Sequence, residues 1–289
     1  MYTSCLAELM QDGATMISYN KDITSLQNPL IKNCVKLRDR RGRDHSGTFL
    51  IEGYRELSRA VTGKIKVRTL FICSDMFLGS NESTLIASIV HENPDLVVCR
   101  CTESVFQKIS YRDRPDGLLA IAEQMKLEWP DIEAAIEGKE NPLIVVAEAI
   151  EKPGNLGTIL RSSDAAGADA LIVCDRCTDI HNPNVVRASV GTLFTVPVIE
   201  VSGSEALAWL HKRGFSVLAA TPSAEKEYTE VDMQCPVAIA VGTEQLGLSK
   251  LWMDECDLQV RLPMSGVADS LNVAMATTLL LYEALRQRK

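Results

Sequence analysis

The sequence lacks the features that would place it in several common classes of protein. It has no run of about 18 apolar residues, the length that a membrane-spanning helix needs. Its first residues lack the basic segment and the long apolar segment of a secretory signal peptide. Neither a GxGxxG sequence nor a Gly-Lys-Ser/Thr sequence occurs, so the two most familiar phosphate-binding loops are missing. We therefore expect a cytoplasmic protein without a membrane anchor.

The nine cysteines also lack the spacing of a disulfide framework. In a chain that does not look secreted, they are expected to be reduced thiols. Cys174 and Cys177 form a CxxC pair, but a zinc site would need a second pair or nearby histidines, and only His181 is close. We interpret the pair as two ordinary thiols at the end of a strand, and no metal is expected.

The net charge of −8 argues against a protein that coats nucleic acid without specificity. The charge is uneven, because residues 1–125 carry 16 basic and 15 acidic side chains, whereas residues 126–289 carry 14 and 23. Five basic residues gather in one stretch of the first part. Such a stretch is either a solvated helix face or a patch that contacts phosphates. The five are Lys36, Arg38, Arg40, Arg41 and Arg43.

The order of helix and strand signals divides the chain into parts. Residues 1–20 show little periodicity and are interpreted as a loose extension, and residues 21–125 as a small α/β domain. Residues 126–142 mix charge, Pro and Gly, as a linker does. From residue 143 to 289, apolar strands alternate with helices, which predicts a parallel sheet whose site lies at the carboxyl ends of its strands.

The elements expected in the small domain are helices over 28–41 and 54–63 and strands over 48–53, 67–73, 96–101 and 118–124. In the second domain we expect strands over 143–150, 170–175, 196–201, 216–221, 237–242 and 258–263. Its helices are predicted over 158–167, 184–194 and 204–214 and at the C-terminus.

Three strand ends of the second domain carry unusual residues. The first has a Pro-Gly-Asn-Leu-Gly turn followed by a helix with Arg161, which invites an anion or a carboxylate partner near the helix start. At the second, Gly242 permits a close approach of the backbone and Glu244 could pair with Arg161. At the third, Ser270 and Asn272 open the last helix, either as simple caps or as one wall of a site.

Together these three segments resemble the motifs of the SpoU, or TrmH, family of RNA 2′-O-ribose methyltransferases of the SPOUT class. The segments are PGNLGTILRSSDAAG, VGTEQLGLS and LPMSGVADSLNVAMATTLLLYE, and the likeness covers residues 143–289. The segments SLQNPLIK and FLIEGYRELSRAV resemble the L30e-like substrate-binding domain of two-domain members. The sequence departs mildly at Thr243, where the family often has Asn, and this departure bears on substrate fit.

The resemblance implies a parallel-sheet domain with a C-terminal trefoil knot, a homodimer, and S-adenosylmethionine as the methyl donor. The target is RNA, with 23S-type rRNA favoured over tRNA. The implied catalytic residues are Arg161, Asn155, Glu244, Ser270 and Asn272. The implied cofactor-binding residues are Ala220, Thr221, Gly242, Leu262, Met264 and Leu271. Arg161 would be either the base for the 2′-hydroxyl or a phosphate clamp, with water or a phosphate oxygen taking the proton.

Two other functions compete with this interpretation. One is an RNA-binding or ribosome-assembly protein that keeps the fold without catalysis, which the five polar residues above disfavour. The other is a different nucleotide enzyme with a Rossmann-like sheet, which the missing phosphate-binding loops disfavour.

Overall fold

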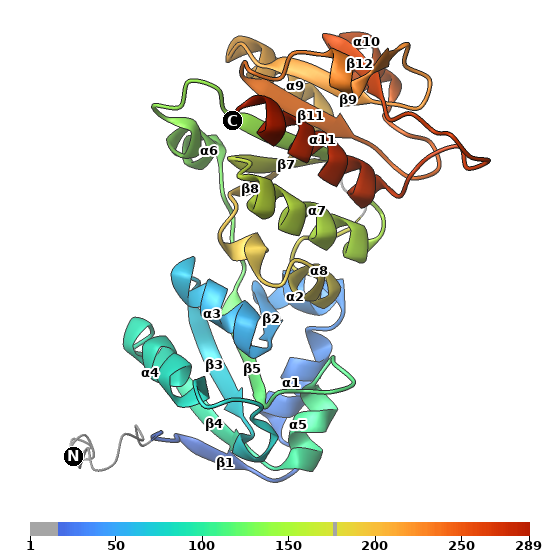
Figure 1. Ribbon diagram of the computed structural model, residues 1–289. Helices are drawn as coiled ribbons and strands as arrows, with labels where there is room; N and C mark the ends of the chain where they lie inside the picture. Colours follow the sequence, from blue (N-terminus) through green and yellow to red (C-terminus); the bar gives the residue numbers. More distant parts are fainter. Residues whose placement is uncertain (1–16, 176–177) are drawn as a thin grey trace.

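The computed structural model describes residues 17–175 and 178–289, and it contains two β-sheets in two units that follow one another along the molecule (Figure 1). Of the expected extension 1–20, the first sixteen residues lie outside the described residues. Asn20 belongs to the N-terminal unit, because its backbone N–H donates to the carbonyl of Val98 at 2.8 Å and its Oδ1 accepts from the Val98 N–H at 2.7 Å.

The N-terminal sheet has five strands in the order β1-β4-β3-β5-β2. The pairs β1–β4 and β4–β3 are parallel, whereas β5 runs antiparallel to both of its neighbours. Its strands are β1 (Lys21–Ile23), β2 (Thr48–Glu52), β3 (Val67–Ile72), β4 (Val97–Cys101) and β5 (Leu118–Glu123). Its helices are α1 (Pro29–Lys36), α2 (Arg40–Ser46), α3 (Tyr54–Thr62), the 3₁₀ turn η1 (Ser74–Met76), α4 (Glu82–Glu92) and α5 (Glu103–Ile109).

The single helix predicted over 28–41 is wrong, because the chain breaks into α1 and α2. Between them it turns so tightly that a Cβ on Gly42 would lie 2.2 Å from the carbonyl oxygen of Lys36. A glycine is therefore required at this contact. The break reorients the basic stretch, so its side chains do not share one helix face.

The C-terminal sheet has seven parallel strands in the order β10-β12-β9-β11-β6-β7-β8. The strands are β6 (Leu143–Glu148), β7 (Ala170–Cys174), β8 (Val198–Val201), β9 (Ser216–Ala220), β10 (Lys226–Glu227), β11 (Val237–Val241) and β12 (Leu258–Arg261). The helices are α6 (Trp129–Ile136), α7 (Pro153–Ala166), α8 (Pro183–Ala188), η2 (Thr192–Phe194), α9 (Gly203–Lys212), η3 (Tyr228–Glu230), α10 (Lys250–Glu255) and α11 (Val273–Gln287). The predicted parallel sheet is confirmed.

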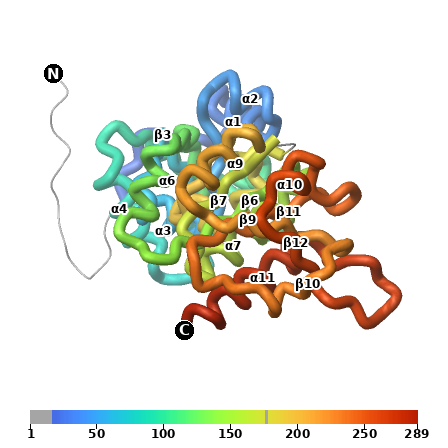
Figure 2. The backbone as a smooth tube through the Cα atoms, turned by 90° about the horizontal axis from the view of Figure 1, so that it is seen from above, coloured from blue at the N-terminus to red at the C-terminus, as the bar shows by residue number. Residues whose placement is uncertain are grey.

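Both faces of this sheet are covered. Along β6, Leu143 and Val145 face a core shared with α7 and α11, whereas Ile144 and Val146 face a core shared with α6, α9 and α10. Figure 2 shows α7 and α9 on opposite sides of the sheet. The strand is buried on both sides, which explains why it reads as an unbroken apolar run.

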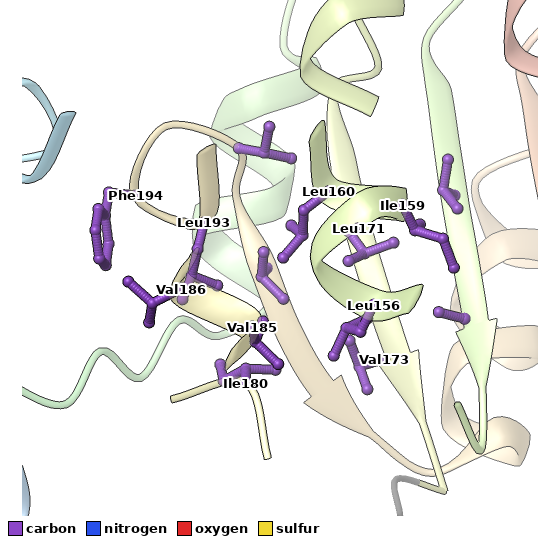
Figure 3. Packing of buried hydrophobic residues seen from close by; sticks show 14 of the residues in the cluster. Leu156, Ile159, Leu160, Leu171, Val173, Ile180, Val185, Val186, Leu193 and Phe194 are labelled. Atoms are coloured by element: carbon purple, nitrogen blue, oxygen red, sulfur yellow. The ribbon is translucent and has the colours of Figure 1, made fainter. Parts of the chain in front are cut away.

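Helix α7 begins five residues earlier than predicted, because the Pro-Gly-Asn-Leu-Gly segment forms its first turns. Proline suits this place, since the first helical residue has no intrahelical acceptor for its N–H. Gly157 is needed for packing, because a Cβ there would lie 2.5 Å from the Cβ of Ala188 on α8. Figure 3 shows Leu156, Ile159 and Leu160 of α7 against strand β7 and helix α8.

The two units are joined by a buried interface. Nη2 of Arg43 lies 2.7 Å from Oδ2 of Asp179, and both side chains are almost fully buried. Phe49 packs against the His181 ring at 4.8 Å and against Phe194 at 6.0 Å between centroids. Arg59 donates to the carbonyl of Val190. A hydrogen-bonded and apolar interface of this kind holds the units in one arrangement.

Across the two described ranges, none of the helices is both long enough and apolar enough to span a membrane.

Candidate active site

Three loops meet at the carboxyl edge of the C-terminal sheet. They follow β6, β11 and β12, and in the sheet β12, β9, β11 and β6 are successive neighbours. Parallel strands bring their carboxyl ends to one edge, so segments that are about a hundred residues apart in the chain become adjacent. The three segments singled out in the sequence therefore border one region.

The Glu244 carboxylate is the centre of this region. Its Oε1 accepts a hydrogen bond from Nδ2 of Asn155 at 2.6 Å and another from Nδ2 of Asn272 at 2.7 Å. Its Oε2 pairs with the Lys152 ammonium. Asn272 also donates to Oδ1 of Asn155 at 3.2 Å. One side chain from each segment thus enters a single hydrogen-bonded network.

The network changes the ionisation of Glu244. The hydrogen bond from Lys152, and after it the one from Asn155, lowers the pKa of the Glu244 carboxyl below its usual value. Glu244 is therefore ionised at neutral pH and accepts hydrogen bonds only. Beside it lies a cavity of about 40 Å³, lined by Ile150, Glu151, Lys152, Asn155, Thr243, Glu244, Gln245 and Val273.

Of the two residues proposed as caps of α11, only one caps the helix. Asn272 is the N-cap, because its Oδ1 accepts from the N–H of Ala274 at 3.1 Å. Ser270 makes no hydrogen bond through its side chain within the described ranges and is exposed. The expectation that Ser270 also caps the helix is wrong, since it lies outside the first turn.

Arg161 lies elsewhere on α7 and does not pair with Glu244. Its side chain is exposed, with no hydrogen bond or ion pair to any residue in 17–175 or 178–289. A helix turns by about 100° per residue, so Arg161 projects from a different side of α7 than Asn155. The predicted ion pair is wrong because Lys152, one turn before Asn155, takes that place.

The residues expected to bind a cofactor lie along the same edge. Gly242 follows β11, and a Cβ there would lie 2.2 Å from the carbonyl oxygen of Gly247. A glycine is therefore required at position 242, because the backbone of the 243–247 turn lies directly against it. The others lie at the end of β9 or after β9 and β12, where Leu262 is partly buried and Leu271 is exposed. They are Ala220, Thr221, Leu262, Met264 and Leu271.

The segment 262–271 offers free backbone groups. Within the described parts of the chain, its N–H and C=O groups make no backbone–backbone hydrogen bonds. Exposed apolar side chains, among them Val267 and Leu271, accompany these groups. Free main-chain donors and acceptors beside apolar side chains suit a purine ring, which has both an apolar face and polar edges.

The basic stretch of the N-terminal unit is divided by its structure. Lys36, Arg40 and Arg41 are exposed, and Arg40 makes one weak pair with Asp44 at 3.5 Å. Arg38 is half-buried and donates to the carbonyl of Ser110 at 2.6 Å. Arg43 was expected to contact RNA, but it is buried in the ion pair with Asp179, so this expectation is corrected.

The CxxC pair was interpreted as two ordinary thiols. Cys174 is buried at the end of β7, and burial raises the pKa of its thiol, while Cys177 lies outside the described residues. In the chain apart from residues 1–16 and 176–177, no group of three His, Cys, Asp or Glu side chains is placed to hold a metal. His181 instead accepts from the Met125 N–H through Nε2 at 3.1 Å.

Sequence reasoning missed Lys152, which pairs with Glu244. Its only signal was its position three residues before Asn155, which places the two one turn apart at the start of a helix. Because this motif predicted a turn before the helix, the sequence did not indicate that Lys152 and Asn155 lie one helical turn apart.

Comparison with known proteins shows the family to which the chain belongs. Residues 142–282 match the SpoU rRNA Methylase family, and residues 28–120 match the MRM3-like substrate binding domain. The chain is 33% identical over 258 residues to the 23S rRNA (uridine(2479)-2′-O)-methyltransferase of Streptomyces viridochromogenes, with 87% of each chain covered.

Solved structures show the same arrangement of both units. One is the crystal structure of an RNA 2′-O ribose methyltransferase, with 41% identity and a TM-score of 0.79, covering 92% of this chain and 99% of that one. Another is the AdoMet-bound rRNA methyltransferase of Sinorhizobium meliloti, with 31% identity and a TM-score of 0.81, covering 92% and 97%.

Proposed function

Since the chain belongs to the SpoU rRNA methylase family, we propose that it transfers a methyl group from S-adenosylmethionine to a ribose 2′-hydroxyl of 23S-type rRNA. Membership of this family makes the chain an S-adenosylmethionine-dependent RNA 2′-O-methyltransferase. What we propose is that its substrate is rRNA and not tRNA. The observation that carries the proposal is the network of Asn155, Glu244 and Asn272, which unites the three family segments at one edge.

The cofactor is assigned to the loops that follow β9, β11 and β12. S-adenosylmethionine supplies an electrophilic methyl group on a sulfonium when it is bound. The free main-chain groups of 262–271 are proposed to hold the adenine edge, with Leu262 and Leu271 against its faces. Ala220, Thr221, Gly242 and Met264 border the same region. The small side chains of Ala220 and Thr221 and the absence of a side chain at Gly242 leave room for close contact with the backbone.

Asn155, Glu244 and Asn272 are proposed to orient the reacting nucleotide. Because Glu244 is ionised and already accepts from two amides and one ammonium, it fixes the rotamers of Asn155 and Asn272. Holding the attacking oxygen in line with the methyl group provides much of the acceleration in such a transfer. Ser270, exposed on the adjoining loop, is assigned a contact to the substrate.

Arg161 is proposed to contact the RNA phosphate next to the reacting ribose. Its guanidinium is exposed and unpaired in the described chain. A protonated guanidinium binds phosphate through two parallel hydrogen bonds. In this arrangement water or a phosphate oxygen accepts the proton that the 2′-hydroxyl loses.

The N-terminal unit is proposed to bind the RNA, with Lys36, Arg40 and Arg41 as exposed phosphate contacts.

We assign residues 21–125 and 143–289 to two domains. The C-terminal trefoil knot expected from the sequence stays a prediction. A cytoplasmic location follows from the proposed substrate, because rRNA is modified where ribosomes are assembled.

A homodimer is proposed from an unpaired apolar surface. Helices α7 and α11 lie side by side over one face of the sheet (Figure 1). On the outer side of α11, Met275 is 62% exposed, Leu279 42% and Tyr282 48%. These positions repeat every three or four residues and form one stripe. A second copy of the chain would cover it and bring a second Arg161 nearby.

The test incubates the purified protein with tritiated S-adenosylmethionine and separate pools of rRNA and tRNA, beside the Arg161→Ala variant. Label mapped to a ribose 2′-oxygen of rRNA, and lost in the variant, is the expected result. Label on tRNA alone would overturn the choice of rRNA. Absence of transfer to either pool despite cofactor binding would favour the non-catalytic RNA-binding alternative.

A further inference from the structure

A large cleft lies between the two units, outside the network around Glu244. Its volume is about 810 Å³. Its walls come from the start of α3, the loop before α4, the loop before β5, and α8 of the C-terminal unit. The side chains that carry the argument are Arg55, Glu56, Arg112, Arg114, Asp116 and Arg187.

The floor of the cleft is a fixed network of charged groups. Arg112 donates to the carbonyl of Glu52 at 2.7 Å and pairs with the Glu56 carboxylate at 2.5 Å. Asp116 accepts from the N–H of Tyr54 at 2.8 Å. The contacts of Arg59 and Gly191 across the interface hold the two walls together, since a Cβ on Gly191 would lie 2.9 Å from the Cα of Glu56. The cleft is therefore formed in advance of any ligand.

The rim of the cleft carries three guanidinium groups without partners. Arg55, Arg114 and Arg187 are exposed, and none of them makes a hydrogen bond or an ion pair to the described part of the chain. Asp113 is an exposed carboxylate on the same rim, so the exposed groups carry a net positive charge. Three unpaired guanidiniums around one concave surface suit an anion with several charges, such as a run of phosphates.

The carboxylates of the wall are turned inward. Oε2 of Glu56 and Oδ1 of Asp116 are buried and accept no hydrogen bond from the described residues. Both oxygens are closed to solvent beneath the Arg112 network, so a ligand in the cleft does not reach them in this conformation. The contacts open to a ligand are those of the rim, where three guanidiniums suit the phosphates of a nucleic acid backbone.

Side chains next to the cleft contact the basic stretch on one side and α7 on the other. Tyr111 lies beside it, 38% exposed, with the Arg38 guanidinium 6.0 Å from its ring centroid and with Nδ2 of Asn184 3.0 Å from its hydroxyl. On the other side, Ala188, which follows Arg187, packs against Gly157 of α7. The cleft therefore lies between residues that contact the basic stretch and the helix that carries Asn155.

We infer that this cleft binds the RNA backbone next to the target nucleotide, with Arg55, Arg114 and Arg187 on successive phosphates and Tyr111 under an unstacked base. The inference rests on the proposed function and deepens it, because it assigns a site that spans both units to the RNA substrate. In this arrangement the fixed interface sets how far the reacting ribose lies from the RNA held by the N-terminal unit.

The test compares the triple variant Arg55→Gln, Arg114→Gln, Arg187→Gln with a matched control, Lys66→Gln, Arg68→Gln, Lys212→Gln. The control residues are exposed cations away from the cleft, two of them paired with Glu123. Binding of a fluorescent single-stranded rRNA fragment is measured by anisotropy over a range of salt concentrations. Each lost phosphate contact should reduce the slope of log affinity against log salt by about 0.7.

The expected result is weaker binding and a slope reduced by about 2 in the triple variant alone, with unchanged binding of S-adenosylmethionine. A triple variant that binds RNA with the affinity and slope of the control would overturn the inference, even where the wild-type protein methylates rRNA. RNA binding that depends on the cleft, in a protein that transfers no methyl group, would retain the inference and reject the proposed function.

Discussion

Nδ2 of Asn272 lies 2.7 Å from Oε1 of Glu244, and this bond joins the cap of the last helix to the loop after β11. The same asparagine caps α11 through its other side-chain atom, Oδ1. A residue that could have been a simple cap therefore has two roles, one for the helix and one for the network. Its amide nitrogen and its oxygen are both used, so neither an aspartate nor a serine could replace it fully.

The acid limb of activity should depend on Lys152. Because the pKa of Glu244 is lowered in the folded protein, the ionised network persists above the usual pKa of a glutamate and is lost as the pH falls through the lowered value. In Lys152→Met the main cause of the lowering is gone, so the limb should move to higher pH. The measurement is the pH dependence of methyl transfer, with Lys250→Met as the control. Identical limbs in the wild-type protein and Lys152→Met would contradict the role of the ion pair.

Replacement of Arg161 should separate activity from stability. The side chain is exposed and unpaired within the described residues, so Arg161→Ala should change the free energy of unfolding by less than about 0.5 kcal/mol. Methyl transfer should fall by about 10²-fold, because a ribose that is misplaced next to the methyl donor reacts far more slowly. For a phosphate contact, Arg161→Lys should mainly raise the KM for RNA and leave the pH profile in place. A shifted pH profile with a loss confined to kcat would assign proton transfer to Arg161 instead.

The buried pair between the units should be a major contribution to stability. Arg43→Ala would leave the Asp179 carboxylate buried without its cation, which typically lowers the free energy of unfolding by about 3–5 kcal/mol. Arg40→Ala removes an exposed pair with Asp44 and should change it by less than about 1 kcal/mol. Urea denaturation of the two variants measures the difference. Equal, small effects would show that the Arg43 pair does not hold the interface.

Two glycines of α7 provide a matched pair of substitutions. Gly157→Ala would force the helix away from Ala188 and should lower the free energy of unfolding by about 1–3 kcal/mol. Gly154 has open space around its Cα, so Gly154→Ala should raise it by up to about 1 kcal/mol through helix propensity. Thermal unfolding checks both directions. A destabilised Gly154→Ala would show that the first turn of α7 is not an ordinary helix.

The apolar stripe on α11 should control the oligomeric state. The double variant Met275→Glu, Leu279→Glu places two charges on the proposed dimer surface and should give a monomer at concentrations where the wild-type protein is a dimer. Leu251→Glu on α10 is the control, since Leu251 is exposed to a similar extent on another helix. Sedimentation velocity distinguishes the species. A wild-type monomer, or a dimer that survives both charges, would reject this surface.

Much of the fold was predictable because it depends on local patterns. The ten predicted strands occur close to their expected positions, since each is a short apolar run bounded by turn residues. The strands β1 and β10 were missed, because they have only three and two residues and too little periodicity to detect. The break between α1 and α2 was also missed, as it depends on contact between Gly42 and the preceding helix.

The sequence by itself determined the family, the parallel sheet and the identity of the polar residues at its edge, because these depend on motif, spacing and hydrophobic period. The partner of each polar group was decided only by the tertiary structure. Lys152 rather than Arg161 pairs with Glu244, and Arg43 is buried against Asp179. Such pairings join residues that lie far apart in the chain, and their geometry depends on how helices rotate and pack, which local patterns do not encode.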